Sequence, residues 1–75
     1  MRTEIQDIQQ AIEILKDHRK MQGITQADMA DFSGLHRKAI GKIEGHGADP
    51  RLSSFLKLAQ LLGIKVILET HEESR

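Results

Sequence analysis

The chain has 75 residues, of which 39% are hydrophobic and 29% are charged, and its formal net charge is zero. A chain of this length folds as one small domain with a limited core, and without cysteine it has neither disulfides nor thiolate zinc ligands to reinforce that core. Self-association is the reinforcement that remains. The apolar runs are far shorter than the ~18 residues of a membrane span and no signal peptide is recognised, so we expect a cytoplasmic protein without a membrane partner.

The zero net charge argues against a nucleic-acid-binding protein, but the charges are unevenly distributed. Residues 1–15 carry an acidic excess, residues 16–51 carry a basic excess, and residues 52–75 are balanced. Because an electric field depends on where the charges lie, a basic middle segment can attract phosphates in a neutral chain. The charge pattern therefore leaves DNA binding open.

The first segment has the apolar spacing of an amphipathic helix. Its apolar stripe is formed by Ile5, Ile8, Ile12 and Leu15. This spacing predicts a helix from about Thr3 to Met21, and Gly23 suits the left-handed turn that ends a helix.

A second helix of two turns is predicted after Thr25. Thr25 stands at the N-cap position and Asp28 occupies the capping-box position three residues later. We expect the buried side of this helix to hold Met29, Ala30 and Phe32. The helix is interrupted at Ser33, where Gly34 permits the positive φ of a turn and Leu35 closes the junction.

A third helix, which is also short, is predicted from about His36 to Glu44. Its inward residues are Ala39, Ile40 and Ile43, and its outward residues are Arg37, Lys38 and Lys42. Gly45 ends this helix, and residues 46–50 form a loop.

A fourth helix begins near Leu52 and stops at Gly63, after which β-branched residues predict a strand over residues 64–70. A lone strand lacks a partner, and the same strand of a second copy, antiparallel across a two-fold axis, would supply one. We expect this dimer contact to involve Ile64, Val66, Ile67 and Leu68. The predicted fold is all-α, a bundle of four or five helices in residues 1–63, with a dimerisation strand at 64–70 and a flexible tail at 71–75.

The second and third helices are joined by three residues that include a glycine, which is the arrangement of a helix-turn-helix. The second helix of such a motif can enter the major groove, where arginine and lysine donate to guanine O6 and N7. Arg37 and Lys38 face outward at the start of this helix, one turn before Lys42. Thr25 and Gln26 begin the preceding helix, and helix N-termini suit phosphate contact.

These residues resemble the Cro/Xre, or lambda-repressor-like, helix-turn-helix family over about residues 12–63. The matching positions are Gly23-Ile24-Thr25-Gln26, Met29-Ala30, Gly34-Leu35, Ile40, Ile43-Glu44-Gly45, Pro50, Leu52, Phe55, Leu58, Ala59, Leu62 and Gly63. The resemblance implies that Gln26, Arg37 and Lys38 occupy base-reading positions, with Lys42 near the backbone or bases. It also implies a structural ion pair between Arg19 and Glu44.

Two positions depart from the family pattern. His36 stands where a serine or threonine usually caps the recognition helix, and it is a candidate for a phosphate contact. Gly41 stands where a serine is common, and a glycine in a helix interior costs about 0.5–1 kcal/mol. Both departures concern the pose of the recognition helix.

The long first helix and the terminal Leu-Gly-Ile-Lys-Val-Ile-Leu-Glu segment are similar to the Hip-type antitoxins. This resemblance implies a homodimer that binds inverted-repeat operator DNA, represses its own operon and neutralises a serine/threonine kinase toxin. Two alternatives stay open: a stand-alone Xre-type transcriptional regulator without a toxin partner, and a protein-interaction module that has lost DNA binding.

The residues do not favour catalysis or metal binding. The four histidines, His18, His36, His46 and His71, share no ligand spacing, and no glycine-rich phosphate loop is present. Ser33, Ser53 and Ser54 stand at expected turn or cap positions. We therefore expect a protein that is not an enzyme and needs no metal or cofactor.

Overall fold

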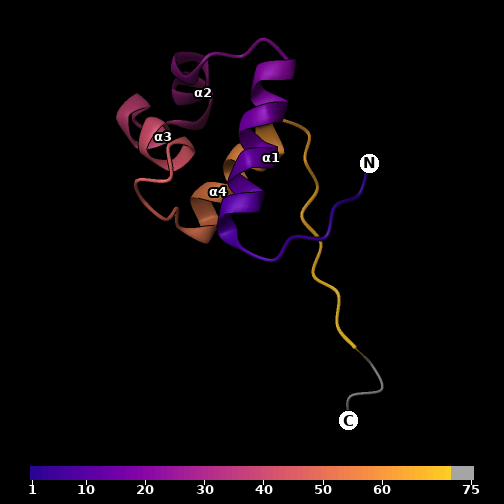
Figure 1. The fold of residues 1–75 in the computed structure, drawn as a ribbon. Coiled ribbons are helices and arrows are strands. Elements are labelled where there is room, and N and C mark those ends of the chain that lie inside the picture. Colours follow the sequence, from indigo (N-terminus) through magenta and orange to yellow (C-terminus); the bar gives the residue numbers. More distant parts are fainter. Residues whose placement is uncertain (72–75) are drawn as a thin grey trace.

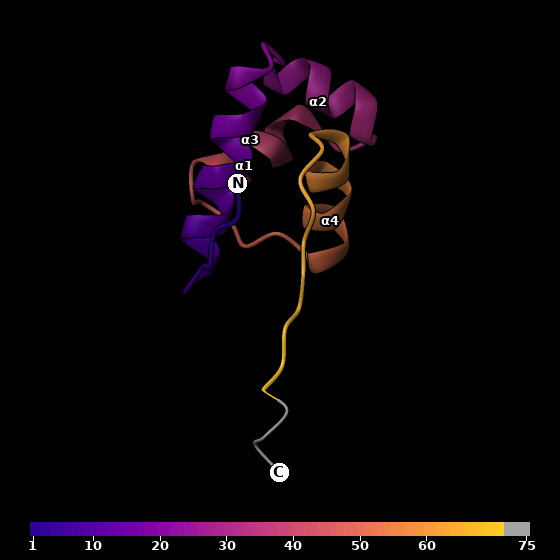
Figure 2. The same cartoon turned by 90° about the vertical axis from the view of Figure 1, so that its right-hand side faces the viewer.

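In the computed structural model, which describes residues 1–71, the chain folds into a bundle of helices. The helices are α1 (Ile8–Met21), α2 (Gln26–Ser33), α3 (Arg37–Glu44) and α4 (Leu52–Leu61). Figure 1 shows α2 and α3 on one side of α1, and Figure 2 shows α1 and α4 on opposite sides of the bundle with α2 across its top. The predicted all-α bundle is therefore confirmed, with four helices in the described residues.

One aliphatic core joins the four helices. Its members are Ile12, Leu15, Met29, Ile40, Ile43, Leu58, Ala59 and Leu62, and none of them is more than 6% exposed. Burial of such side chains contributes about 25 cal/mol per Å² of apolar surface and is the main term that holds a domain of this size together. No helix in the described residues combines the length and the hydropathy that crossing a bilayer requires.

Helix α1 begins later than the apolar stripe predicts. Asp7 is its N-cap, and the Asp7 carboxylate accepts a hydrogen bond from the Gln10 N–H at 2.9 Å. Ile5 and Ile8 are 46% and 41% exposed, so the stripe extends beyond the core. The predicted start at Thr3 is wrong, because an aspartate that caps a helix end outweighs apolar residues with nothing to pack against.

Helix α2 has the predicted start and stop. The Asp28 N–H donates to Thr25 Oγ1 at 3.0 Å, and the Thr25 N–H donates to Asp28 Oδ2 at 3.2 Å, which completes the capping box. Gly34 ends the helix with φ of 77°, a left-handed conformation that glycine adopts without steric cost. Both predictions are confirmed.

The predicted burial of Phe32 is wrong. Phe32 is 60% exposed, and Ser33 is buried in its place beside Met29. At 3.6 residues per turn, position 33 lies closer to the direction of Met29 than position 32 does. The Ser33 carbonyl accepts from Lys57 Nζ at 3.3 Å and its hydroxyl accepts from the Leu35 N–H at 3.1 Å, so the polar groups of this buried residue are satisfied.

The segment after α4 has no strand within the residues that the structure describes. Gly63 has φ of 76°, and the Ile64 N–H donates to the Ala59 carbonyl at 2.8 Å, which closes the end of α4. The following residues leave the bundle as an extended trace (Figures 1 and 2). A β-strand requires a paired neighbour, and the described part of this single chain provides none, so the predicted strand and its dimer pairing stay a prediction. Residues 72–75 of the predicted tail lie outside the described residues.

Candidate nucleic-acid interface

Helix α3 is held by one face and exposes the other. Ile40 and Ile43 are 1% and 6% exposed and pack into the core. Arg37, Lys38 and Lys42 are all exposed. The helix therefore presents three cations to solvent from a rigid support, and such cations can donate hydrogen bonds to base edges or phosphates.

The start of α2 provides a second polar surface. Thr25 is exposed, and its Oγ1 accepts the Asp28 N–H while its hydroxyl hydrogen stays available as a donor. Helix N-termini carry free N–H groups and the positive end of the helix dipole, so this end can bind an anion such as a phosphate.

His36 is the N-cap of α3, but its side chain makes no capping hydrogen bond. Its backbone is extended, with φ of −68° and ψ of 141°, and its side chain is exposed. The replacement of the usual cap by histidine thus leaves the first turn of α3 without a side-chain acceptor. An imidazole at this position can donate to a phosphate, more strongly when protonated.

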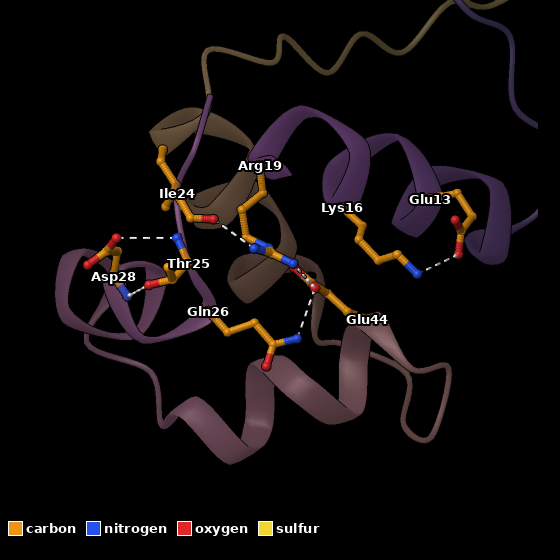
Figure 3. A network of polar contacts seen from close by, with 8 residues as sticks. All are labelled: Glu13, Lys16, Arg19, Ile24, Thr25, Gln26, Asp28 and Glu44. Carbon is orange, nitrogen blue, oxygen red and sulfur yellow. Dashed lines mark hydrogen bonds and ion pairs between the residues drawn. The ribbon is translucent and has the colours of Figure 1, made fainter. Parts of the chain in front are cut away.

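Arg19 and Glu44 form a buried ion pair between α1 and α3 (Figure 3). The Arg19 Nε lies 2.6 Å from Glu44 Oε2, and its Nη2 lies 2.8 Å from Glu44 Oε1. A third guanidinium nitrogen, Nη1, donates to the Ile24 carbonyl at 2.7 Å. The two side chains are only 9% and 5% exposed, so this bidentate pair is shielded from solvent.

Gln26 is the predicted site residue whose surroundings the sequence did not indicate. It is half-buried, and its Nε2 donates to Glu44 Oε1 at 3.1 Å. No feature of the sequence indicates this contact, because it depends on how α2 and α3 lie against each other in the folded chain. Gln26 is therefore connected to the buried ion pair as well as to the surface that α2 and α3 present.

A polar contact outside the predicted site joins α1 to the loop before α4. His46 has a left-handed backbone with φ of 62°, and its Nε2 lies 2.8 Å from Glu13 Oε2. This hydrogen bond, helped by the nearby charge of Lys16, holds the pKa of the Glu13 carboxyl below its ordinary range against a smaller opposing effect of desolvation. This pair could not be predicted from the sequence, because its two residues come from segments that only the folded chain brings together.

The predicted dimer residues lie in two environments. Ile64 is half-buried and packs against the core. Val66, Ile67 and Leu68 are 44%, 57% and 93% exposed. In the described residues, no group of three or more histidine, cysteine, aspartate or glutamate side chains is arranged to hold a metal ion.

Comparison with curated proteins identifies two similar proteins. The chain is 42% identical over 52 residues to the SPbeta prophage-derived HTH-type transcriptional regulator YonR of Bacillus subtilis (strain 168), a match that covers 69% of this chain and 48% of that protein. It is 33% identical over 54 residues to the control protein C.SmaI of Serratia marcescens, covering 72% of this chain and 64% of that protein. The chain thus spans about half to two thirds of the length of these relatives.

Solved structures share the fold over nearly the whole chain. A HipB–O2 20mer complex contains a chain with a TM-score of 0.83 and 25% identity, covering 96% of this chain and 100% of that one. The HipA-HipB-O2-O3 complex contains a chain with a TM-score of 0.82 and 24% identity, covering 95% of this chain and 100% of that one. The family described as helix-turn-helix matches residues 15–67. With this match spanning most of the core, both polar surfaces and the turn between them, the chain belongs to the helix-turn-helix family of the Cro/Xre type.

Proposed function

We propose that this protein is a sequence-specific DNA-binding transcriptional repressor. The observation that carries the proposal is α3, whose buried residues Ile40 and Ile43 anchor it while Arg37, Lys38 and Lys42 stand exposed. A helix so anchored can enter the major groove without losing its packing, and its cations can then donate to guanine. The two curated relatives, named as a transcriptional regulator and a control protein, support the same function.

The side chains have different roles in DNA binding, according to their position on the helices. Arg37 and Lys38, at the start of α3, contact base edges, and Lys42 contacts the backbone or bases one turn later. Thr25 and His36 lie at two helix N-termini, where phosphates bind. Phosphate contacts fix the register of the protein on the duplex, while base contacts supply the sequence preference.

The repressor acts as a homodimer. The extended segment that leaves α4 exposes Val66, Ile67 and Leu68, and pairing with the same segment of a second copy would cover these side chains and satisfy the backbone. A two-fold axis then sets the two α3 helices about 34–36 Å apart, one turn of DNA, and the operator is an inverted repeat. Occupation of a promoter by such a dimer blocks transcription sterically, without a ligand.

The finer assignment is an antitoxin that represses its own operon and neutralises a Hip-type kinase toxin. The resemblance of the terminal segment to the Hip-type antitoxins and the likeness to HipB chains over nearly the whole length support this assignment. The second candidate is a stand-alone regulator, which is favoured by the 42% identity to YonR, a protein named as a transcriptional regulator. In either case the protein works in the cytoplasm, where its operator lies.

Binding to sheared genomic DNA at physiological salt, followed by sequencing of the retained fragments, tests the proposal. We expect one enriched inverted repeat next to the protein's own gene. The Arg37→Ala/Lys38→Ala variant should lose this enrichment while remaining folded. An Arg2→Ala/Lys16→Ala variant removes the same charge from two ion pairs outside the proposed interface, one exposed and one half-buried, and should retain the enrichment.

Failure of the wild-type protein to enrich any sequence would refute the proposed DNA-binding function and favour a protein-interaction module. The reading frame beside an enriched repeat separates the two candidates. A kinase-type neighbour whose product copurifies with this protein supports the antitoxin, and the absence of such a neighbour supports the stand-alone regulator. Affinity for the repeat should fall steeply as salt rises, because phosphate contacts release counterions.

A further inference from the structure

The Glu44 carboxylate lies where three helices meet. It accepts hydrogen bonds from two guanidinium nitrogens of Arg19 on α1 and from the amide nitrogen of Gln26 at the start of α2 (Figure 3). Glu44 itself is the last residue of α3. One buried side chain therefore links the core of the bundle to the first residue of the helix whose N-terminus faces DNA in the proposed function.

This arrangement dictates which way the Gln26 amide points. A carboxylate paired with a guanidinium can only accept hydrogen bonds, so the –NH₂ group of Gln26 has to face it. The amide oxygen is thereby directed away from Glu44. Figure 3 shows the amide nitrogen toward Glu44 and the oxygen toward the ribbon of α3. The orientation follows from the chemistry of the partner, although an isolated amide could be placed either way.

Gly41 supplies the space into which this oxygen projects. A Cβ atom built on Gly41 would lie 3.5 Å from Gln26 Oε1, which is ordinary contact. The γ atoms of a branched side chain lie one bond beyond the Cβ, so a γ methyl directed toward the amide would come closer to Oε1 than ordinary contact allows. The absence of a side chain at position 41, which costs helix stability, therefore coincides with the place where the Gln26 amide rests on α3.

We propose that Glu44 and Gly41 are positioning residues that hold the Gln26 amide in one orientation before DNA binds, so that this amide is a preset part of the DNA-reading surface. The inference rests on the proposed DNA-binding function and adds a specificity element to it. A side chain that is already ordered loses little conformational freedom on binding, and its hydrogen-bonding groups are presented in a single arrangement. The Arg19–Glu44 pair thus acts on recognition as well as on folding.

A double-mutant cycle between positions 41 and 26 tests the proposal. Gly41→Val is expected to displace the amide without removing either member of the ion pair, whereas a change at Glu44 would leave the buried Arg19 without its carboxylate partner and endanger the fold. We expect Gly41→Val and Gln26→Ala each to lower affinity for the operator about tenfold relative to random DNA. We expect the double variant to bind within about twofold of Gln26→Ala, because valine then has no amide to displace.

The control for folding is thermal unfolding of each variant, which should be cooperative in all four proteins. Additive effects, with the double variant about a hundredfold weaker than the wild type, would overturn the proposal, since valine would then act directly on DNA or on α3. If the wild-type chain bound no operator at all, the proposed function would fail and this inference would fail with it.

NMR of the DNA-free protein gives a reading that does not depend on operator binding. We expect one side-chain amide proton of Gln26 to be shifted downfield by its bond to the Glu44 carboxylate and to exchange slowly with water. Gly41→Val should return both amide protons to the positions of an exposed glutamine. Exposed-type resonances already in the wild-type protein would overturn the proposed preset orientation even where operator binding is normal.

Discussion

Replacement of Arg19 by methionine should remove a large part of the stability of the domain. The change leaves the Glu44 carboxylate, 5% exposed, with Gln26 as its remaining side-chain donor among the described residues, and it deprives the Ile24 carbonyl of the Nη1 donor at 2.7 Å. Breaking one side of a buried ion pair costs about 3–5 kcal/mol. A domain of this size has about 4–11 kcal/mol in total, from roughly 0.05–0.15 kcal/mol per residue, so the variant should be close to unfolded at 37 °C.

The assay is urea denaturation followed by circular dichroism, at one fixed chain concentration because dimer stability depends on concentration. The double variant Arg19→Met/Glu44→Met should recover about 2 kcal/mol or more, because no unpaired charge then stays buried. Arg2→Ala is the matched control, since it removes an exposed arginine–carboxylate pair with Glu69 at 3.5 Å and should change stability by less than about 0.5 kcal/mol. A loss below about 1 kcal/mol for Arg19→Met would refute the reasoning, because the pair would then behave as an exposed one.

Three further predictions concern other parts of the chain. Gly41→Ala should raise the free energy of unfolding by about 0.5–1 kcal/mol, since its Cβ meets the Gln26 oxygen at an ordinary 3.5 Å; a lowered melting temperature would contradict this. Because the pKa of Glu13 is depressed in the folded chain, its contact with His46 stabilises the fold at pH values above the unfolded-state pKa, and this stabilisation is lost as the pH falls through the folded-state pKa. Glu13→Gln should therefore flatten the acid limb of a profile of stability against pH, and an unchanged acid limb would count against the contact. Val66→Pro/Ile67→Pro should yield monomers in sedimentation equilibrium while α1–α4 stay folded. Consecutive N–H groups of a strand point to its opposite edges, so one of the two prolines must remove a hydrogen bond to the partner strand. A persistent dimer would place the interface elsewhere.

The local features of the helices could be predicted because their causes are local. Thr25 and Asp28 cap α2 through bonds between residues three apart, and Gly34 adopts the left-handed conformation that only the turn itself requires. The extent of burial could not be predicted in the same way. Ile5 has the correct spacing for α1 but lies beyond the core, and Phe32 is exposed, so apolar periodicity overstated the burial of both residues. Periodicity specifies a face, and only packing decides how far along a helix that face is covered.

In the candidate site, too, the local features could be predicted from the sequence and the long-range contacts could not. The exposure of Arg37 and Lys38 follows from the register of α3 against its buried isoleucines, and the sequence predicts it. The contact between Gln26 and Glu44 joins residues 18 positions apart, and it depends on how α2 crosses α3. A buried carboxylate requires hydrogen-bond donors, and Gln26 supplies one in addition to the two from Arg19. The proposed orientation of Gln26 therefore depends on the same ion pair that joins α1 to α3. Substitutions at Glu44 should therefore change stability and DNA recognition together, whereas those at Lys42 should change recognition alone.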